Sequence, residues 1–418
     1  MFYSFGYRYN FEKSRIEKTG VFFIKSYPKN ASIYLNDKLQ KRKTPTQINR
    51  LLANNYNLRV EKEGYYSWSK NLPIYPQTTT FAEDITLFKK GLKPNLMIEG
   101  NFSEIKPALN LQKMILVENL NPGSNLIYHN LLSNKNTSLT SSKNLLKTSS
   151  WCNSNNKIIV KDGNDYLIIN VESGNVDSLL NLTKNYFINV QCDFYNDNVF
   201  YALQNKKLYE IDLVQRKITK LTDDIVLSFT SWKSKIIYIA LVDNKYILKS
   251  LSGENSTELL VMPTSLDYTF IQSNQNYLAI LDKDEKIVYI IDPEANQPYK
   301  TIIKQVNDLA WYDKQFIYWN EFELWAYYPE SQESIFIERA STPIQNAFWH
   351  SAFTYVFGQI NNILKVYELD GRDSRNVHEI LTLTDDTKDN IFVNKKGDKL
   401  YWLSTINDQM GLFEVEIQ

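Results

Sequence analysis

Histidines are the residues used most often for acid–base and metal chemistry, and this chain has only three: His129, His350 and His378. Each lies in a different stretch of the sequence, whereas a zinc site takes about four ligands at short, regular spacings. The histidines therefore predict no metal site, and we expect no cofactor. His350 directly follows Trp349 at an expected strand end, where a hydrogen-bonded turn histidine is the favoured interpretation.

Carboxylates are numerous, but none stands in a pattern typical of catalysis. Neighbouring acids occur at Asp223–Asp224, at Asp282 with Asp284, and at Asp385–Asp386. Glycoside cleavage needs two acids held about 5 to 10 Å apart across a substrate, and the sequence singles out no such pair. The Gly-x-Ser-x-Gly elbow of serine hydrolases, Gly-rich phosphate loops and dinucleotide fingerprints do not occur in the sequence. The sequence favours a protein that is not an enzyme; a hydrolase or lyase with acids assembled from distant segments is the alternative.

Four tryptophans are the candidate ligand-binding residues. They are Trp151, Trp232, Trp311 and Trp349, each near the end of a short apolar run. Their rings are suited to stacking on sugars or on a peptide. Packing between neighbouring structural units is the alternative and the favoured interpretation, because large rings also fill such seams.

The two cysteines, Cys152 and Cys192, lie 40 residues apart. In an oxidising compartment they are able to form a disulfide between neighbouring units. Such a bond needs α-carbons roughly 4.4 to 6.8 Å apart, and we expect matching positions on adjacent inner strands to exceed that distance. Two buried free thiols are therefore the favoured prediction.

Length and charge narrow the class of protein. With 418 residues the chain exceeds the roughly 250 to 300 residues at which one core stops growing, so two modules are expected. Lysine plus arginine and aspartate plus glutamate both number 47, which argues against a nucleic-acid partner because phosphates call for a basic excess. Aromatic residues make up 14% of the chain, a composition that favours strands.

Residues 1–18 form an aromatic and basic segment. Met1–Phe11 is rich in Phe and Tyr and is followed by Lys13, Arg15 and Lys18. Such clusters are typical of the water interface next to a membrane span. We therefore expect either the remnant after a membrane tether upstream of Met1 or, equally, an arm that packs on the first domain.

Residues 19–88 read as a small all-β sandwich, with short alternating strands separated by turn residues. Five separated elements carry a family resemblance: Ser26, Pro28 and Ala31; Tyr34–Asn36; Thr44–Pro45; Tyr56, Leu58 and Val60; and Gly64–Tyr65. In this order and spacing the segment resembles the PEGA domain. Asn30, Asp37 and Asn54–Asn55 replace glycines of that family, at turns where Asn and Asp tolerate positive φ. The resemblance implies a bacterial or archaeal surface-associated module without catalytic residues.

Residues 92–418 repeat at about 40 residues, the period of a four-stranded propeller blade. A polar turn leading into a strand recurs at 155–160, 196–201, 233–238, 274–279, 313–318 and 397–402. An alternating strand recurs at 166–171, 208–213, 287–292, 324–328, 364–369 and 412–417. The repeats resemble divergent propellers of the WD-like or Tol type.

The number of repeats predicts a propeller of about eight blades, with seven as the alternative. Innermost strands are expected near Pro107, Thr148, Ile188, Leu227, Tyr268, Leu309, Ala347 and Ile391. The last repeat supplies only three strands, which would leave an exposed sheet edge. We predict that residues 95–99 add the fourth strand and close the ring.

These observations predict an all-β protein made of a PEGA-like sandwich and a β-propeller. We expect a non-enzymatic, extracytoplasmic protein of the cell envelope that presents its propeller to a protein, peptide or glycan partner. A structural envelope component is the alternative function, and the cytoplasm is the alternative location.

Overall fold

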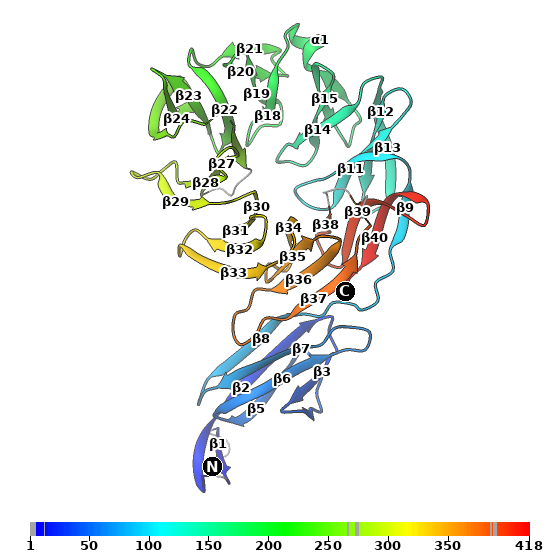
Figure 1. Cartoon of the computed structure of the whole chain (residues 1–418), viewed down its shortest axis with the longest axis vertical. Helices are drawn as coiled ribbons and strands as arrows, with labels where there is room; N and C mark the ends of the chain where they lie inside the picture. Colours follow the sequence, from blue (N-terminus) through cyan, green and yellow to red (C-terminus); the bar gives the residue numbers. More distant parts are fainter. Residues whose placement is uncertain (1–5, 12, 266, 272–275, 385–386, 388–390) are drawn as a thin grey trace.

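The computed structural model describes residues 6–11, 13–265, 267–271, 276–384, 387 and 391–418. Among these residues nearly every element is a strand, and the single helix, α1 (Leu179–Thr183), has five residues. Figure 1 shows a small β-domain at the N-terminal end and a ring of sheets beyond it. Within the described residues, no helix is both long and apolar enough to cross a lipid bilayer.

The N-terminal domain is a sandwich of two four-stranded sheets. One sheet contains β1 (Tyr7–Asn10), β2 (Arg15–Tyr27), β5 (Thr46–Leu52) and β8 (Thr79–Thr86); the other contains β3 (Ser32–Leu35), β4 (Lys38–Leu39), β6 (Asn54–Glu61) and β7 (Trp68–Ile74). Successive side chains of a strand point to opposite faces. Phe22 and Ile24 of β2 accordingly face Leu58 and Val60 of β6 in a fully buried core. The sandwich predicted from alternation is confirmed.

Two of the three predicted glycine replacements adopt the left-handed backbone. Asn30 has φ of 63° and Asp37 has φ of 62°, a region that Asn and Asp enter at modest cost. Asn54–Asn55 differs from the prediction, because these residues begin β6 and pair with β7. Strand pairing has replaced the expected turn there.

Within the described residues, the rest of the chain forms eight four-stranded antiparallel sheets. Blade 1 contains β10 (Phe102–Pro107), β11 (Lys113–Asn119), β12 (Ser124–Asn130) and β13 (Lys135–Ser142); blade 2 contains β14 (Leu146–Trp151), β15 (Lys157–Asp162), β16 (Asp165–Asn170) and β17 (Val176–Ser178). Blade 3 contains β18 (Ile188–Cys192), β19 (Val199–Gln204), β20 (Lys207–Asp212) and β21 (Lys217–Lys220); blade 4 contains β22 (Ile225–Trp232), β23 (Lys235–Val242), β24 (Lys245–Ser252) and β25 (Asn255–Met262). Blade 5 contains β26 (Tyr268–Ile271), β27 (Leu278–Asp282), β28 (Ile287–Ile291) and β29 (Tyr299–Lys304); blade 6 contains β30 (Asp308–Tyr312), β31 (Gln315–Trp319), β32 (Glu323–Tyr328) and β33 (Glu333–Arg339). Blade 7 contains β34 (Ile344–Trp349), β35 (Tyr355–Ile360), β36 (Ile363–Glu368) and β37 (Val377–Thr382); blade 8 contains β38 (Phe392–Val393), β39 (Lys399–Ile406), β40 (Gln409–Glu416) and β9 (Asn95–Glu99).

The ring closes as predicted, because β9 supplies the fourth strand of the last blade. It pairs antiparallel with β40, with Leu412 opposite Ile98 and Gly411 opposite Glu99. A side chain at Gly411 would place its Cβ 2.2 Å from the carbonyl oxygen of Ile98, so a glycine is needed for this close pairing. The predicted positions of the eight inner strands agree with the structure; of the turn expected at 274–279, residues 274 and 275 lie outside the described residues.

Eight hydrophobic clusters join the blades, one at each seam around the ring. The second strand of each blade explains this arrangement, because its two faces pack against different neighbours. In β15, Ile158 and Val160 face blade 1 while Ile159 faces blade 3. Strands buried on both faces read as continuous apolar runs, which is the pattern that repeats in the sequence.

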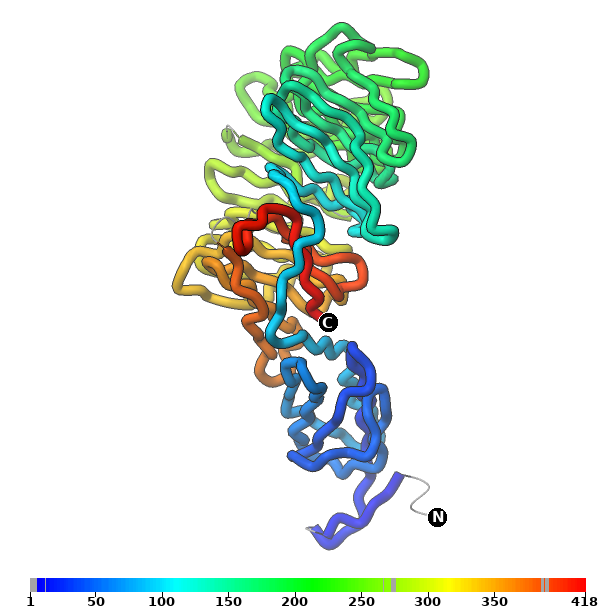
Figure 2. Tube along the Cα trace, turned by 90° about the vertical axis from the view of Figure 1, so that its right-hand side faces the viewer, coloured from blue at the N-terminus to red at the C-terminus, as the bar shows by residue number. Residues whose placement is uncertain are grey.

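The sandwich docks on blade 7 through a buried ion pair. Lys70 of β7 lies 3.1 Å from Glu368 at the end of β36, and both side chains are buried, with 0% and 4% exposed. The Lys70 ammonium also donates to three backbone carbonyls, those of Asp370, Arg372 and Ser374. The Trp68 indole N–H donates to Glu368 at 2.7 Å. Figure 2 shows that only one end of the sandwich meets the propeller.

Candidate ligand-binding site

The inner strands of blades 2 to 5 line a cavity of about 1110 Å³ at the centre of the propeller. Most polar side chains in its wall are uncharged hydroxyls and amides, among them Ser149, Ser150, Asn189, Gln191, Ser228 and Thr230. The wall also contains the charged residues Asp193, Lys206 and Asp267, together with aromatic and aliphatic side chains. A concave surface of this kind, with hydrogen-bonding groups between aromatic side chains, is typical of small-molecule and oligomer sites.

Irregular pairing brings some of these residues to the cavity. The pairing of the inner strands β14, β18 and β22 with the next strand of each blade shifts register between Thr148 and Ser150, between Ile188 and Gln191, and between Val226 and Ser228. A β-bulge of this kind turns an extra residue out of the regular ladder and re-aims its side chain. Ser149, Asn189 and Leu227 lie within these shifts and line the cavity.

The structure brings two of the four candidate tryptophans, Trp151 and Trp232, to this cavity. All four belong to the hydrophobic clusters at blade seams. The Trp151 and Trp349 indoles donate to backbone carbonyls of the preceding blade, Lys106 at 3.3 Å and Ala310 at 2.9 Å. Seam packing thus describes Trp151 and Trp349 well.

Trp232 differs from that pattern. Its ring is 2% exposed, and its indole nitrogen has no hydrogen-bond partner within the described residues. The Lys233 ammonium lies 4.4 Å from the centre of the ring. A buried donor left unpaired costs about 1 to 3 kcal/mol, so the Trp232 indole differs from those of Trp151 and Trp349, whose N–H groups are paired. The indole nitrogen of Trp311 is likewise unpartnered among the described residues, but Trp311 does not line this cavity.

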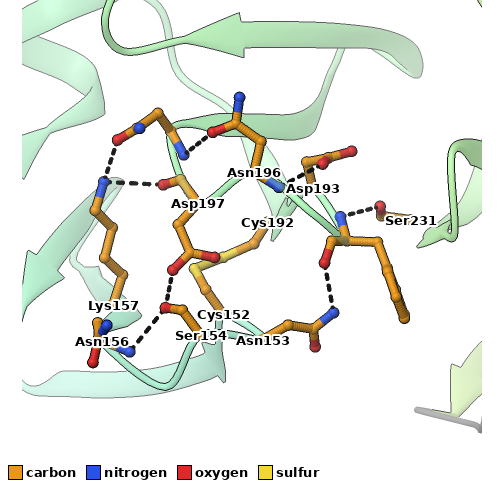
Figure 3. Close-up of a disulfide and its surroundings, with 12 residues drawn as sticks. Cys152, Asn153, Ser154, Asn156, Lys157, Cys192, Asp193, Asn196, Asp197 and Ser231 are labelled. Atoms are coloured by element: carbon orange, nitrogen blue, oxygen red, sulfur yellow. Dashed lines mark hydrogen bonds between the residues drawn. A yellow bond between two sulfur atoms is a disulfide. The ribbon is translucent and has the colours of Figure 1, made fainter.

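One wall of the cavity is tied together by a disulfide between Cys152 and Cys192, shown in Figure 3. The prediction of two free thiols is therefore wrong. The α-carbons lie 5.5 Å apart, because Cys152 directly follows β14 and Cys192 ends β18 at a place where the inner strands of adjacent blades come together. The spacing of 40 residues matched the blade period but could not give this distance.

Polar bonds between loops surround the disulfide. The Asn153 amide donates to the carbonyl of Phe194 at 2.9 Å, and the backbone N–H of Phe194 donates to Ser231 at 2.9 Å. The Lys157 ammonium donates to the carbonyl of Asp197 at 3.0 Å, and the Ser154 hydroxyl donates to the Asp197 carboxylate. These contacts link blades 2, 3 and 4 along the rim (Figure 3), so the disulfide and the hydrogen bonds cross-link this wall of the cavity.

Two of the acidic residues named from the sequence, Asp224 and Asp282, take part in structural contacts. Asp224 accepts hydrogen bonds from Tyr238 at 2.9 Å and Lys249 at 3.0 Å. Buried Asp282 accepts from Ser265 at 2.7 Å. Asp385 and Asp386 lie outside the described residues. Across the described part of the chain, no group of three or more His, Cys, Asp or Glu side chains is arranged to hold a metal ion.

The Asp308 carboxyl has a perturbed environment away from this cavity. Asp308, at the start of β30, lines a separate space of about 470 Å³ beside Gln345 and Phe392. Desolvation by the surrounding protein raises the pKa of the Asp308 carboxyl, although a hydrogen bond from the backbone N–H of Leu309 opposes the shift. No second acidic side chain lines this space among the described residues.

His129 lies in blade 1, whereas His350 and His378 both belong to blade 7. His350 is buried, and its Nδ1 accepts a hydrogen bond from the backbone N–H of Ala352 at 3.0 Å. Nε2 therefore carries the proton and donates to the carbonyl of Gly397 at 2.9 Å, and the side-chain amide of Gln418 lies 2.8 Å from the same nitrogen. Desolvation lowers the pKa of His350 to about 4. The prediction of a hydrogen-bonded turn histidine is confirmed.

Comparison with known proteins supports the two-part architecture. Residues 19–89 match the family model of the PEGA domain. No curated protein sequence matches the chain.

Among solved structures, a eukaryotic initiation factor is similar with a TM-score of 0.54 at 11% identity, covering 92% of this chain and 98% of the other. The Dos1 propeller is similar with a TM-score of 0.53 at 13% identity, covering 78% and 94%. Dipeptidyl peptidase 4 of Porphyromonas gingivalis is similar with a TM-score of 0.52 at 10% identity, covering 75% and 57%. At these identities the likeness shows the propeller fold alone, and propellers serve many unrelated functions.

Proposed function

We propose that this protein is a non-enzymatic, extracytoplasmic binding protein that takes an uncharged polar ligand, a glycan or a peptide, into the central cavity of its propeller. The observation that carries the proposal is the cavity wall. Hydroxyl and amide side chains from four inner strands line a cavity of about 1110 Å³, and the Trp151 and Trp232 side chains are part of its wall. Sugar hydroxyls and peptide carbonyls are the groups that such donors and acceptors recognise.

Two further observations support this location and role. The Cys152–Cys192 disulfide favours an oxidising compartment, because thiols in the cytosol are generally kept reduced. The sandwich is joined to blade 7 by the Lys70–Glu368 pair, so it suits the role of a stiff stalk that holds the propeller away from its attachment. The PEGA domain at residues 19–89 fits the same role.

The test uses the full chain, fluorescently labelled, on a glycan array and on a peptide array. Ser228→Trp places a large ring in the cavity and obstructs it, and Ser228 has no side-chain hydrogen bond to lose among the described contacts. We expect binding to one array and its loss in Ser228→Trp, but not in Ser133→Trp, which places the same ring at an exposed turn of blade 1. Absence of binding to both arrays, or binding that Ser228→Trp leaves unchanged, would refute the proposal.

A further inference from the structure

The other end of the molecule carries an unusual hairpin. Strand β1 pairs with the first residues of β2, and Figures 1 and 2 show this N-terminal hairpin projecting from the end of the sandwich that lies farthest from the propeller. The N-terminal hairpin is defined here as Tyr7–Phe11 together with Lys13–Lys18. An isolated two-stranded ribbon is marginally stable in water. A contact with another surface would therefore stabilise a hairpin that projects from its domain.

The register gives the N-terminal hairpin two different faces. Directly paired residues share a face, and Tyr9 pairs with Ile16 while Arg8 pairs with Glu17. The first face carries exposed apolar side chains, with Tyr9 45% and Ile16 54% exposed, and the exposed Lys18, which pairs with Tyr7, lies on it as well. Phe11, beyond the end of β1, is 84% exposed and contacts the ring of Tyr9 with a centroid distance of 5.0 Å.

The opposite face is ionic. Glu17 accepts hydrogen bonds from Asn10 and from Arg15, both at 2.7 Å, and lies 3.4 Å from Lys13. Residues 7–18 of the sequence contain four basic residues and two acidic ones. The N-terminal hairpin therefore combines exposed aromatic and aliphatic side chains with a positive net charge.

We propose that the N-terminal hairpin docks on a membrane surface that contains anionic lipids. Tyr9, Phe11 and Ile16 enter the headgroup region, where amphipathic and aromatic side chains are favoured. Lys18, on the same face as Tyr9 and Ile16, lies beside the lipid phosphates, which attract basic residues close to the surface, and Arg8 and Lys13 add to the positive charge of the hairpin.

The size of the hairpin favours a lipid surface over a protein partner. A stable protein interface uses about 20 to 30 residues on each side, whereas the exposed apolar side chains here number three, Tyr9, Phe11 and Ile16. A fluid lipid interface needs no such complementary surface. The proposal does not depend on the propeller cavity and can fail or succeed without it.

The test is co-sedimentation of the full chain with vesicles of mixed phosphatidylcholine and phosphatidylglycerol. We expect the double variant Phe11→Ser/Ile16→Ser to lower the vesicle-bound fraction about ten-fold. Removing each positive charge, as in Lys13→Gln and Arg8→Gln, is expected to lower it about five-fold. Tyr186→Ser removes an exposed ring of the propeller, 61% exposed, and serves as the matched control without effect.

A second measurement reports whether residue 11 itself enters the lipid. Both native cysteines are joined in the disulfide, so Phe11→Cys provides a single thiol for an environment-sensitive dye, whose emission is expected to shift to the blue with the mixed vesicles. No binding to mixed vesicles, binding that the hairpin variants leave unchanged, or a dye signal identical with and without vesicles overturns the proposal. A dimer that forms without lipid and that Phe11→Ser dissociates also overturns it, because the apolar face then belongs to a second copy.

Discussion

The two ends of the sandwich use the same residue types in opposite ways. At the propeller end, Lys70 and Trp68 are buried and every donor of the ammonium finds an oxygen of blade 7. At the other end, Phe11 and Lys13 stand in solvent. We call the propeller end of the sandwich the near end and the opposite end the far end. The difference teaches that burial, and not residue type, shows what an aromatic or basic residue does. At the near end these residues contact other parts of this chain, whereas the far end exposes apolar surface that nothing in the described chain covers.

The largest effect is expected from Lys70→Met, which removes the buried ion pair of the near end. The variant leaves the Glu368 carboxylate buried without its cation, which typically costs 3 to 5 kcal/mol. We expect urea titration followed by tryptophan fluorescence to show a loss of about that size in the free energy of unfolding. Trypsin should also reach the linker, which contains Lys89, Lys90 and Lys93.

Lys113→Met provides the control for that variant. Lys113 pairs with Glu172 at 2.8 Å, but the Glu172 side chain is 55% exposed, and water can solvate a carboxylate that loses its partner. We expect a loss of about 1 kcal/mol or less and no trypsin sensitivity in the linker. Equal losses for Lys70→Met and Lys113→Met would mean that burial does not distinguish the near end.

The second prediction uses pH to weaken the near end. His350 contacts the ring of Phe88, which follows the sandwich, and burial holds the pKa of His350 at about 4. The unfolded chain has a histidine pKa of about 6.5, so between these values unfolding takes up a proton. The contribution is complete above pH 6.5 and is lost as pH falls to 4, a change of about 3 kcal/mol.

The measurement compares the wild type with His350→Gln between pH 7 and pH 4. Because burial also lowers the pKa of His129 and His378, only the difference between the two proteins reports His350. We expect the wild type to lose more stability than the variant over this interval. Parallel pH profiles would show that the His350 environment does not titrate as inferred.

The third prediction concerns one hydrogen bond at the near end. Trp68→Phe removes the indole N–H that donates to Glu368 at 2.7 Å; a bond to a charged group contributes about 1.5 to 3 kcal/mol. Trp349→Phe removes a bond to a neutral carbonyl and should cost about 1 kcal/mol on the same scale. A Trp68→Phe loss no larger than that of Trp349→Phe would indicate that Glu368 is satisfied without Trp68.

Much of the fold was predictable from the sequence because the apolar runs recur at the length of one blade, even where no family motif is present. The middle strands of the blades pack on both faces, so runs such as Ile158–Val160 recur at the blade period and predicted eight inner strands and the closing strand β9. The disulfide was not predictable, because the period fixes a spacing along the chain and not the 5.5 Å between α-carbons.

The docking of the two modules had a signal that the sequence analysis missed. In β7 the buried positions alternate, and Lys70 lies in phase with Trp68, Leu72 and Ile74. A lysine on the inward phase of a strand is rarely buried without a partner, so it pointed to a carboxylate elsewhere. Glu368 lies about 300 residues away, and no local pattern could identify it. The indole of Trp232, which has no hydrogen-bond partner in the described part of the chain, likewise depends on three-dimensional packing.

The smallest expected effect on stability is that of a substitution at the far end, and a small effect is what the comparison predicts there. Phe11→Ser removes a ring that is 84% exposed and pairs only with Tyr9 among its described ring contacts. A surface change of this kind alters the free energy of unfolding by about 0.5 kcal/mol or less, which thermal and urea unfolding in lipid-free buffer will measure. An unchanged free energy of unfolding would mean that the Phe11 ring does not stabilise the fold, which agrees with a role in contact with another surface. A loss of about 2 kcal/mol in the free energy of unfolding would instead show that Phe11 packs within the chain, and that the two ends of the sandwich are more alike than their exposure suggests.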